Sequence, residues 1–128
     1  MSRQIFNAPN AAPAVGPYSH AVRTSGELLF ISGQIPIDES GEMVGSTAPE
    51  QARQCLKNLS TIAEAAGTSL DRAVKLTVLL TDIGAFADVN AAYAEFFPSD
   101  PPARVAYQVG ALPRGAQVEI DAVVAVGD

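Results

Sequence analysis

Cysteine, histidine and tryptophan are almost absent from this sequence. Its 128 residues include one cysteine, Cys55, one histidine, His20, and no tryptophan. A single thiol cannot form an internal disulfide, which favours a reducing, cytoplasmic location and a buried structural role for Cys55. One histidine without a neighbouring ligand makes no metal site of known spacing, so we expect no metal and assign His20 no catalytic role.

Long hydrophobic runs and basic clusters are missing as well. The first ten residues, MSRQIFNAPN, lack the apolar core of a signal peptide. All apolar runs are far shorter than the ~20 residues that span a bilayer, so we expect no membrane partner. Eight basic and 14 acidic residues give a net charge of −6. An acidic protein repels phosphate backbones, which argues against nucleic acid as a partner.

Charged residues of both signs are scarce. They make up 17% of the chain, where about 25% is usual for a globular domain. This scarcity indicates that copies of the chain cover part of its surface. The 48% of apolar residues is enough for one core, and the length predicts a single domain over residues 1–128.

Two segments have the apolar periodicity of helices. The first begins with a capping box formed by Thr47 and Glu50, has Pro49 in its first turn, and ends at Gly67. Its apolar stripe comprises Ala52, Cys55, Leu56, Leu59, Ile62, Ala63 and Ala66. The second helix is predicted to start near Asp82 and to end at Pro98, with Phe86, Val89, Tyr93 and Phe96 on one side.

The remaining apolar segments alternate as strands do. We predict a short strand at 3–6, a hairpin over 20–36 around Ser25-Gly26, a strand at 73–81 and a second hairpin over 104–126 around 113–115. Five or six strands with two helices predict an α+β fold of two layers, in which the helices pack on one face of a mixed sheet.

Arg104 opens the first strand of the second hairpin. Side chains alternate across a strand, and matching the valine-rich faces of the two strands leaves Arg104, Glu119 and Asp121 away from the helices. That second face is half apolar, and another subunit is the simplest cover for it. An ion pair with Glu119 or Asp121 is the ordinary explanation of Arg104. The alternative is a guanidinium whose planar fork binds a small carboxylate.

Two further polar residues are candidates for a site. Tyr18 follows Gly16-Pro17 in a stiff connector, where a phenol can be held in place. Asn90 lies beside the apolar stripe of the second helix and needs a hydrogen-bond partner. A loop backbone is the expected partner of Asn90, and substrate is the alternative.

Four segments and the helix between them together resemble one family. They are GPYSHAV (16–22), LFISGQIPID (29–38), FADVNAAYAEFF (86–97) and PPARVAYQVGALPRGAQVEIDAVVA (101–125). On these motifs the chain is identified as a member of the RidA (YjgF) family. The resemblance implies a chorismate-mutase-like fold, a homotrimer built around a barrel, and ligand clefts between subunits. It also implies hydrolysis of 2-iminobutanoate and 2-iminopropanoate, or their enamine tautomers, to 2-keto acids and ammonia, without metal or cofactor.

The resemblance also assigns site residues. Arg104 binds the substrate carboxylate, and Tyr18 and Glu119 complete the catalytic set. For substrate binding the resemblance adds Ser32, Gly33 and Ala106 to Arg104, with Gly33 and Ala106 offering backbone groups. Asn90 joins this set because of its place on the second helix. The chain departs from the family at 105–106, where many members have Ser or Thr and then Cys or Thr. Here Val105 and Ala106 exclude any thiol or hydroxyl contribution.

Other functions stay open at this point. A non-catalytic module that binds small 2-keto acids would use the same arginine. A ribonuclease or translation inhibitor, also attributed to the family, is disfavoured by the net charge. A chorismate mutase shares the fold, but its dianionic substrate needs more than one clustered cation, and only Arg104 is expected on that face.

Overall fold

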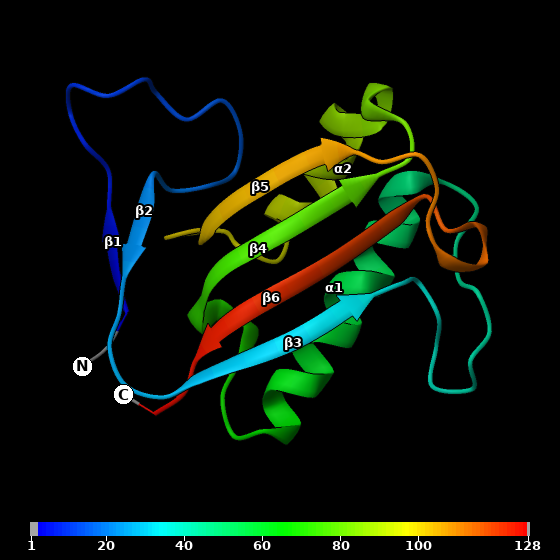
Figure 1. The fold of residues 1–128 in the computed structure, drawn as a ribbon, viewed down its shortest axis with the longest axis horizontal. Helices are drawn as coiled ribbons and strands as arrows, with labels where there is room; N and C mark the ends of the chain where they lie inside the picture. Colours follow the sequence, from blue (N-terminus) through cyan, green and yellow to red (C-terminus); the bar gives the residue numbers. More distant parts are fainter. Residues whose placement is uncertain (1–2, 128) are drawn as a thin grey trace.

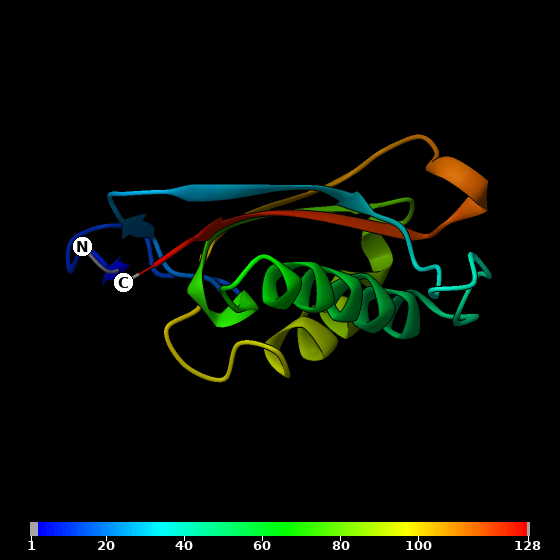
Figure 2. The ribbon, with the colours of Figure 1, turned by 90° about the horizontal axis from the view of Figure 1, so that it is seen from below.

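A computed structural model describes residues 3–127 (Figure 1). The α+β architecture is confirmed, with two α-helices and six strands. The strands are β1 (Gln4–Phe6), β2 (Ala21–Arg23), β3 (Leu28–Gln34), β4 (Ala73–Leu80), β5 (Ala103–Gln108) and β6 (Val118–Ala125). The helices are α1 (Ala48–Ala65) and α2 (Phe86–Ala94), with short 3₁₀ turns η1 (Leu70–Arg72), η2 (Ile83–Ala85) and η3 (Pro113–Gly115). Both α-helices lie on the same face of the main sheet (Figure 2).

The six strands divide between two sheets. The main sheet has the order β3-β6-β4-β5, and β1 pairs with β2 in a separate antiparallel ribbon. Both predicted hairpins are therefore wrong, because β2 and β3 lie in different sheets and β4 lies between β5 and β6. In the first case, β2 pairs with β1 instead of β3. In the second case, the physical reason is the crossover through α2, which returns the chain parallel to β4 and places β5 at the sheet edge.

This pairing reverses the predicted orientation of β5. Arg104 is the partner of Leu76, which is fully buried under the helices, and cross-strand partners share a face. Val105 and Tyr107 are 42% and 49% exposed on the helix-free face. Arg104 thus points toward the helices, and its predicted place on the opposite face is wrong. Glu119, in contrast, lies between buried neighbours on β6 and faces away from the helices as predicted.

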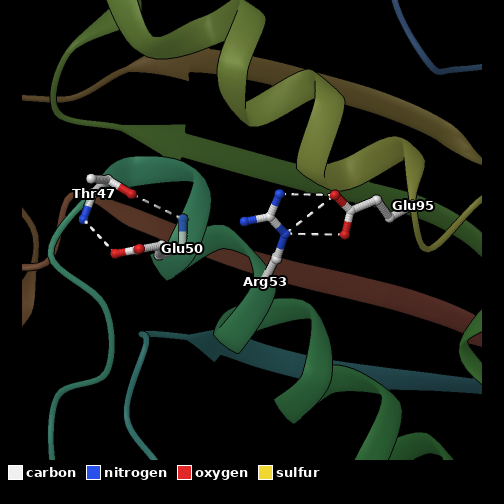
Figure 3. Close-up of polar contacts among 4 residues, drawn as sticks. All are labelled: Thr47, Glu50, Arg53 and Glu95. Carbon is white, nitrogen blue, oxygen red and sulfur yellow. Dashed lines mark hydrogen bonds and ion pairs between the residues drawn. The ribbon is translucent and has the colours of Figure 1, made fainter.

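Helix α1 forms as its local signals predict. The Thr47 hydroxyl accepts the Glu50 N–H at 3.4 Å, and the Glu50 carboxylate accepts the Thr47 N–H at 3.2 Å (Figure 3). Gly67 follows the helix with φ of +88°, a conformation that favours glycine. The predicted stripe is buried apart from Ile62 and Ala66. Through its buried side chains, α1 packs across β6 and β3.

Helix α2 starts later than predicted. Asp82 caps the 3₁₀ turn η2 by accepting the Gly84 N–H at 2.8 Å, and α2 begins only at Phe86. A bidentate ion pair between Arg53 and Glu95 joins the end of α2 to α1, with N–O distances of 3.0 and 2.8 Å (Figure 3). Within residues 3–127, the helices are too short or too polar to cross a membrane.

The capping box makes the stability of the fold depend on pH. Hydrogen bonds from the backbone N–H groups of Ser46 and Thr47 hold the pKa of the Glu50 carboxyl below its ordinary value of 4.5. A carboxyl whose pKa is lowered on folding stabilises the fold above its ordinary pKa, and this contribution is lost as pH falls through the lowered value. We expect Glu50→Gln to melt below the parent at pH 7, and the gap in Tm to narrow progressively as the pH falls below 4.5. A gap that stays constant in melting curves across this range would contradict the assignment.

Candidate functional site

The candidate site residues fall into two clusters on opposite faces of the main sheet. We call the first the arginine cluster; it consists of Arg104, Tyr18, Asn90, Phe86 and Tyr93. We call the second the glutamate cluster; it consists of Gly33, Thr77, Leu79, Glu119 and Asp121. One chain does not bring Arg104 and Glu119 to the same face.

Aromatic rings surround the guanidinium of Arg104. Its central carbon lies 5.0 Å from the ring centre of Tyr93, 5.4 Å from that of Phe86 and 5.5 Å from that of Tyr18. One terminal nitrogen donates to the Asn90 side-chain oxygen at 2.6 Å. Cation–π contacts of this kind stabilise a desolvated guanidinium by up to about 2 kcal/mol. The cluster therefore fixes the direction of Arg104 without neutralising its charge.

Arg104 has no carboxylate partner among the described residues. The one ion pair within residues 3–127 joins Arg53 to Glu95. Burial lowers the pKa of the Arg104 guanidinium, and the neighbouring Tyr93 and Tyr18 raise it. The expected ion pair with Glu119 or Asp121 is therefore wrong, because both carboxylates lie on the other side of the sheet. Apart from the bond to Asn90, the guanidinium makes no hydrogen bond to residues 3–127, which leaves most of its fork for an anion.

The connector between β1 and β2 places Tyr18. The Ser19 N–H donates to the Pro102 carbonyl at 3.2 Å, and the Ser19 hydroxyl donates to the Pro101 carbonyl at 2.5 Å. These bonds tie the connector to the segment that leads into β5. The Tyr18 hydroxyl accepts the Val15 N–H at 3.1 Å, which leaves its own proton free to donate.

Helix α2 contributes one face to the arginine cluster. Phe86, Asn90 and Tyr93 recur at positions i, i+4 and i+7, so all three lie along one side of the helix. The partner of Asn90 is the guanidinium rather than the expected loop backbone. The sequence placed Phe86 and Tyr93 on one side of the second helix, and their contact with Arg104 was not predicted. The helical spacing around Asn90 was the signal that could have revealed it.

Tyr93 is the deepest residue of the arginine cluster. Its side chain is fully buried, and its hydroxyl has no hydrogen-bond partner within residues 3–127. Burial raises the pKa of this phenol, and the nearby positive charges of Arg104 and Arg3 lower it. Tyr93 therefore presents a neutral aromatic face to the guanidinium.

The glutamate cluster is built on close contact between β3 and β6. Pairing of these strands is interrupted between Ile31 and Gln34, which places Gly33 against the Glu119 side chain. A Cβ added at Gly33 would lie 2.9 Å from the Glu119 carboxyl carbon and closer still to one carboxyl oxygen. Asp121 accepts the Thr77 N–H at 3.1 Å, so this second carboxylate is fixed to the backbone.

The remaining predicted residues occupy neighbouring positions. Ser32 is exposed on β3 beside Gly33. Ala106 lies two residues after Arg104 on the helix-facing side of β5, packed against the core. Thus Arg104, Tyr18 and Asn90 come together as one group, and Glu119 and Gly33 as another.

Two other expectations concern reactive and metal-binding groups. Cys55 is buried as predicted, and desolvation raises the pKa of its thiol to about 12. Such a thiol is protonated and unreactive at neutral pH. Within residues 3–127, no group of three or more His, Cys, Asp or Glu side chains could hold a metal ion.

Comparison with known proteins shows close relatives over nearly the whole chain. A family model described as endoribonuclease L-PSP matches residues 8–126. The chain is 59% identical over 119 residues to the RutC family protein y4sK of Sinorhizobium fredii, covering 91% of this chain and 94% of that protein. It is 46% identical over 126 residues to the human 2-iminobutanoate/2-iminopropanoate deaminase, covering 98% of this chain and 91% of that protein.

Solved structures of relatives share the fold. The crystal structure of the Rid-family protein YyfB from Yersinia pestis has a TM-score of 0.90 at 30% identity, covering 98% of this chain and all of that one. The structure of TdcF from E. coli with bound serine has a TM-score of 0.74 at 35% identity, covering 97% of this chain and 99% of that one.

Proposed function

The chain belongs to the RidA (YjgF) family, and we propose that it hydrolyses the C=N bond of small 2-imino acids such as 2-iminopropanoate and 2-iminobutanoate. In this reaction water adds to the iminium carbon, the C–N bond breaks, and the products are a 2-keto acid and ammonium. Relatives of 44–46% identity bear the name of this deaminase. The single cysteine fits a reducing compartment, and we place the protein in the cytoplasm.

The observation that carries the proposal is the free fork of Arg104. Every 2-imino acid has a carboxylate next to the reacting carbon, and a guanidinium binds a carboxylate through two parallel hydrogen bonds. The aromatic rings and Asn90 hold the guanidinium in one orientation, while most of its N–H groups lack partners within residues 3–127. Fixing an already electrophilic iminium in this way can supply about 7–11 kcal/mol in favourable cases.

The second half of the proposal concerns water. Glu119 is a carboxylate without an ion-pair partner within residues 3–127 and has the chemistry to orient a water and accept its proton. It lies on the opposite face of the sheet from Arg104, so a single chain presents two half-sites. In the proposed enzyme, Glu119 of one copy and Arg104 of its neighbour meet in a cleft between them, and Tyr18 closes that cleft.

The helix-free face of the sheet supports assembly into a homotrimer. Phe30 is 73% exposed on this face, and Val105 and Tyr107 are also exposed there. The face carries no helix within residues 3–127 (Figure 2). Apolar side chains grouped on one sheet face mark a surface for association, and a contact between two different surfaces of identical chains closes into a ring such as a trimer when the rotation closes.

Mixing two impaired variants tests whether the site is shared. We expect Arg104→Ala and Glu119→Gln each to retain no more than about 3% of the parental activity alone. After co-refolding in equal amounts, random assembly should restore about a quarter of the sites, because some clefts then combine an intact arginine with an intact glutamate from the neighbouring copy. Activity at that level, in oligomers of trimeric mass by light scattering, supports the shared cleft. Absence of any recovery in trimers containing both variants contradicts it.

The activity itself is tested with 2-iminopropanoate that is generated in situ. A dehydratase releases 2-iminopropanoate from serine, and its decay to pyruvate is followed with and without the protein. Acceleration at catalytic amounts of protein supports the proposal. Binding of pyruvate without acceleration supports the second candidate, a non-catalytic module for small carboxylates, which the same free fork of Arg104 favours.

A further inference from the structure

Gly16 lies where three of the candidate site residues meet. A Cβ added at this glycine would lie 3.0 Å from Arg104 Nη2, 3.4 Å from Asn90 Nδ2 and 3.6 Å from Cε2 of the Tyr18 ring. The first of these distances is shorter than ordinary van der Waals contact, and the other two are close to it. Gly16 therefore leaves the guanidinium room that any larger residue would occupy.

The backbone at Gly16 does not itself require glycine. Its φ lies outside the left-handed region, so alanine can adopt this backbone conformation without strain. The effect of a side chain at this position must then come from the groups that it meets. The nearest of these is Nη2 of Arg104.

The connector has little freedom to move away from the guanidinium. The Tyr18 N–H donates to the Gly16 carbonyl at 2.9 Å across Pro17, whose ring restricts the backbone of this tight turn. The Tyr18 hydroxyl accepts the Val15 N–H, and two bonds from Ser19 tie the connector to the segment before β5 (Figure 1). A methyl group added at Gly16 is therefore relieved mainly by movement of the guanidinium.

The position of the guanidinium depends on every one of its neighbours. Nη1 of Arg104 donates to the Asn90 side-chain oxygen at 2.6 Å, and the rings of Phe86 and Tyr93 lie 5.4 and 5.0 Å from the central carbon. Nη2 makes no hydrogen bond within residues 3–127, and Gly16 is the backbone that bounds it. Because Nη2 is one prong of the fork that binds a carboxylate, a small shift of this nitrogen changes the direction of the fork.

We propose that Gly16 is a positioning residue of the carboxylate clamp, which by lacking a side chain lets Nη2 of Arg104 take the direction that a substrate carboxylate requires. The inference rests on the proposed function of Arg104, and in this role Gly16 acts through the guanidinium. A Cβ at Gly16 forces Nη2 away by a few tenths of an ångström. Since a misplacement of about 1 Å can cost a factor of 100, we expect this smaller one to cost about tenfold.

Pyruvate binding and the kinetics of imine hydrolysis test this role. We expect Gly16→Ala to bind pyruvate about tenfold more weakly in titration calorimetry, and to raise KM for 2-iminopropanoate more than it lowers kcat. Gly110→Ala should bind pyruvate as the parent does, because an added Cβ at Gly110 has no atom within 4 Å. A Gly16→Ala protein with parental affinity for pyruvate overturns the inference.

Melting temperatures test the contact without any ligand. Crowding should lower the Tm of Gly16→Ala by a few degrees in the otherwise parental protein. In an Arg104→Ala background the methyl group meets no guanidinium. The same change should then leave Tm unchanged or raise it, because alanine lowers the conformational entropy of the unfolded chain. An equal fall in Tm in both backgrounds assigns the damage to another contact and overturns the inference.

Failure of this inference is distinct from failure of the proposed function. Parental pyruvate affinity in Gly16→Ala overturns the inference and does not affect the hydrolysis of 2-iminopropanoate by the parent. Conversely, a parent that accelerates no imine hydrolysis contradicts the deaminase activity. Weaker pyruvate binding by Gly16→Ala, with a fall in Tm that requires Arg104, would still support the placement of the guanidinium by Gly16.

Discussion

Replacement of Arg104 by alanine is expected to lower kcat/KM for 2-iminopropanoate by at least about 30-fold. Removing one partner of a partly buried, hydrogen-bonded charge pair costs roughly 2–5 kcal/mol, and each 1.4 kcal/mol is a factor of ten in rate. Arg104→Lys should lose most of the same activity, because an ammonium cannot form two parallel bonds with a carboxylate. The imine-decay assay measures both variants, and calorimetry with pyruvate should show the loss of binding.

The Arg104 variants need evidence that the fold survives. The guanidinium makes one hydrogen bond, to Asn90, within residues 3–127, so its removal should leave melting temperature and oligomer mass near the parental values. Arg114 is the matched control, since it is exposed in the η3 turn and donates to the Gly41 carbonyl at 2.9 Å. Parental turnover in Arg104→Ala would refute the carboxylate clamp. Unfolding or loss of assembly would instead assign Arg104 a structural role.

The helices could be predicted from sequence because their signals are local. Thr47, Glu50 and Gly67 fix both ends of α1 within a few residues of the chain, and all three behave as expected. The start of α2 was less accurate because Asp82 caps a 3₁₀ turn before the α-helix begins. An N-cap residue marks where free backbone N–H groups need a hydrogen-bond acceptor. The first turn of a 3₁₀-helix and that of an α-helix both have such groups, so a cap alone does not distinguish them.

Strand pairing could not be predicted in the same way. Alternation along 103–108 identifies two faces of β5, but it does not say which of them meets the helices. That choice depends on β4, a partner reached only through the α2 crossover, and pairing with β6 instead leads to the opposite answer. The error changed the place of Arg104 in the fold, although the resemblance had already singled out the residue.

The composition of the arginine cluster has the same non-local origin. Phe86 and Tyr93 have the spacing of core residues, and both do pack against the core. Only the arrival of β5 beside α2 turns their rings toward the guanidinium. The contact of Gly33 with Glu119 likewise depends on the irregular pairing of β3 with β6, which no short motif indicates.

Replacement of Gly33 by alanine is expected to reduce kcat about as strongly as replacement of Glu119 by glutamine, on the order of 100-fold for a lost general base. Gly33 has no left-handed backbone conformation, so alanine causes no backbone strain there. Its methyl group would instead overlap the end of the Glu119 side chain, which is flexible and must swing away. The carboxylate would leave the position from which we propose that it holds water, while the fold of the chain stays intact.

A double-mutant cycle separates this mechanism from general damage. If the methyl group acts by displacing Glu119, then Gly33→Ala should have little further effect in a Glu119→Gln background, because both changes remove the same interaction. Gly110→Ala is the matched control, since Gly110 is exposed, has ordinary backbone angles and has no atom within 4 Å of an added Cβ. Losses that add fully in the double variant, or a Gly33→Ala enzyme with parental kcat, would show that Glu119 does not act from the position beside Gly33. A fall in kcat with little change in pyruvate affinity would place the effect on the water rather than on the carboxylate clamp.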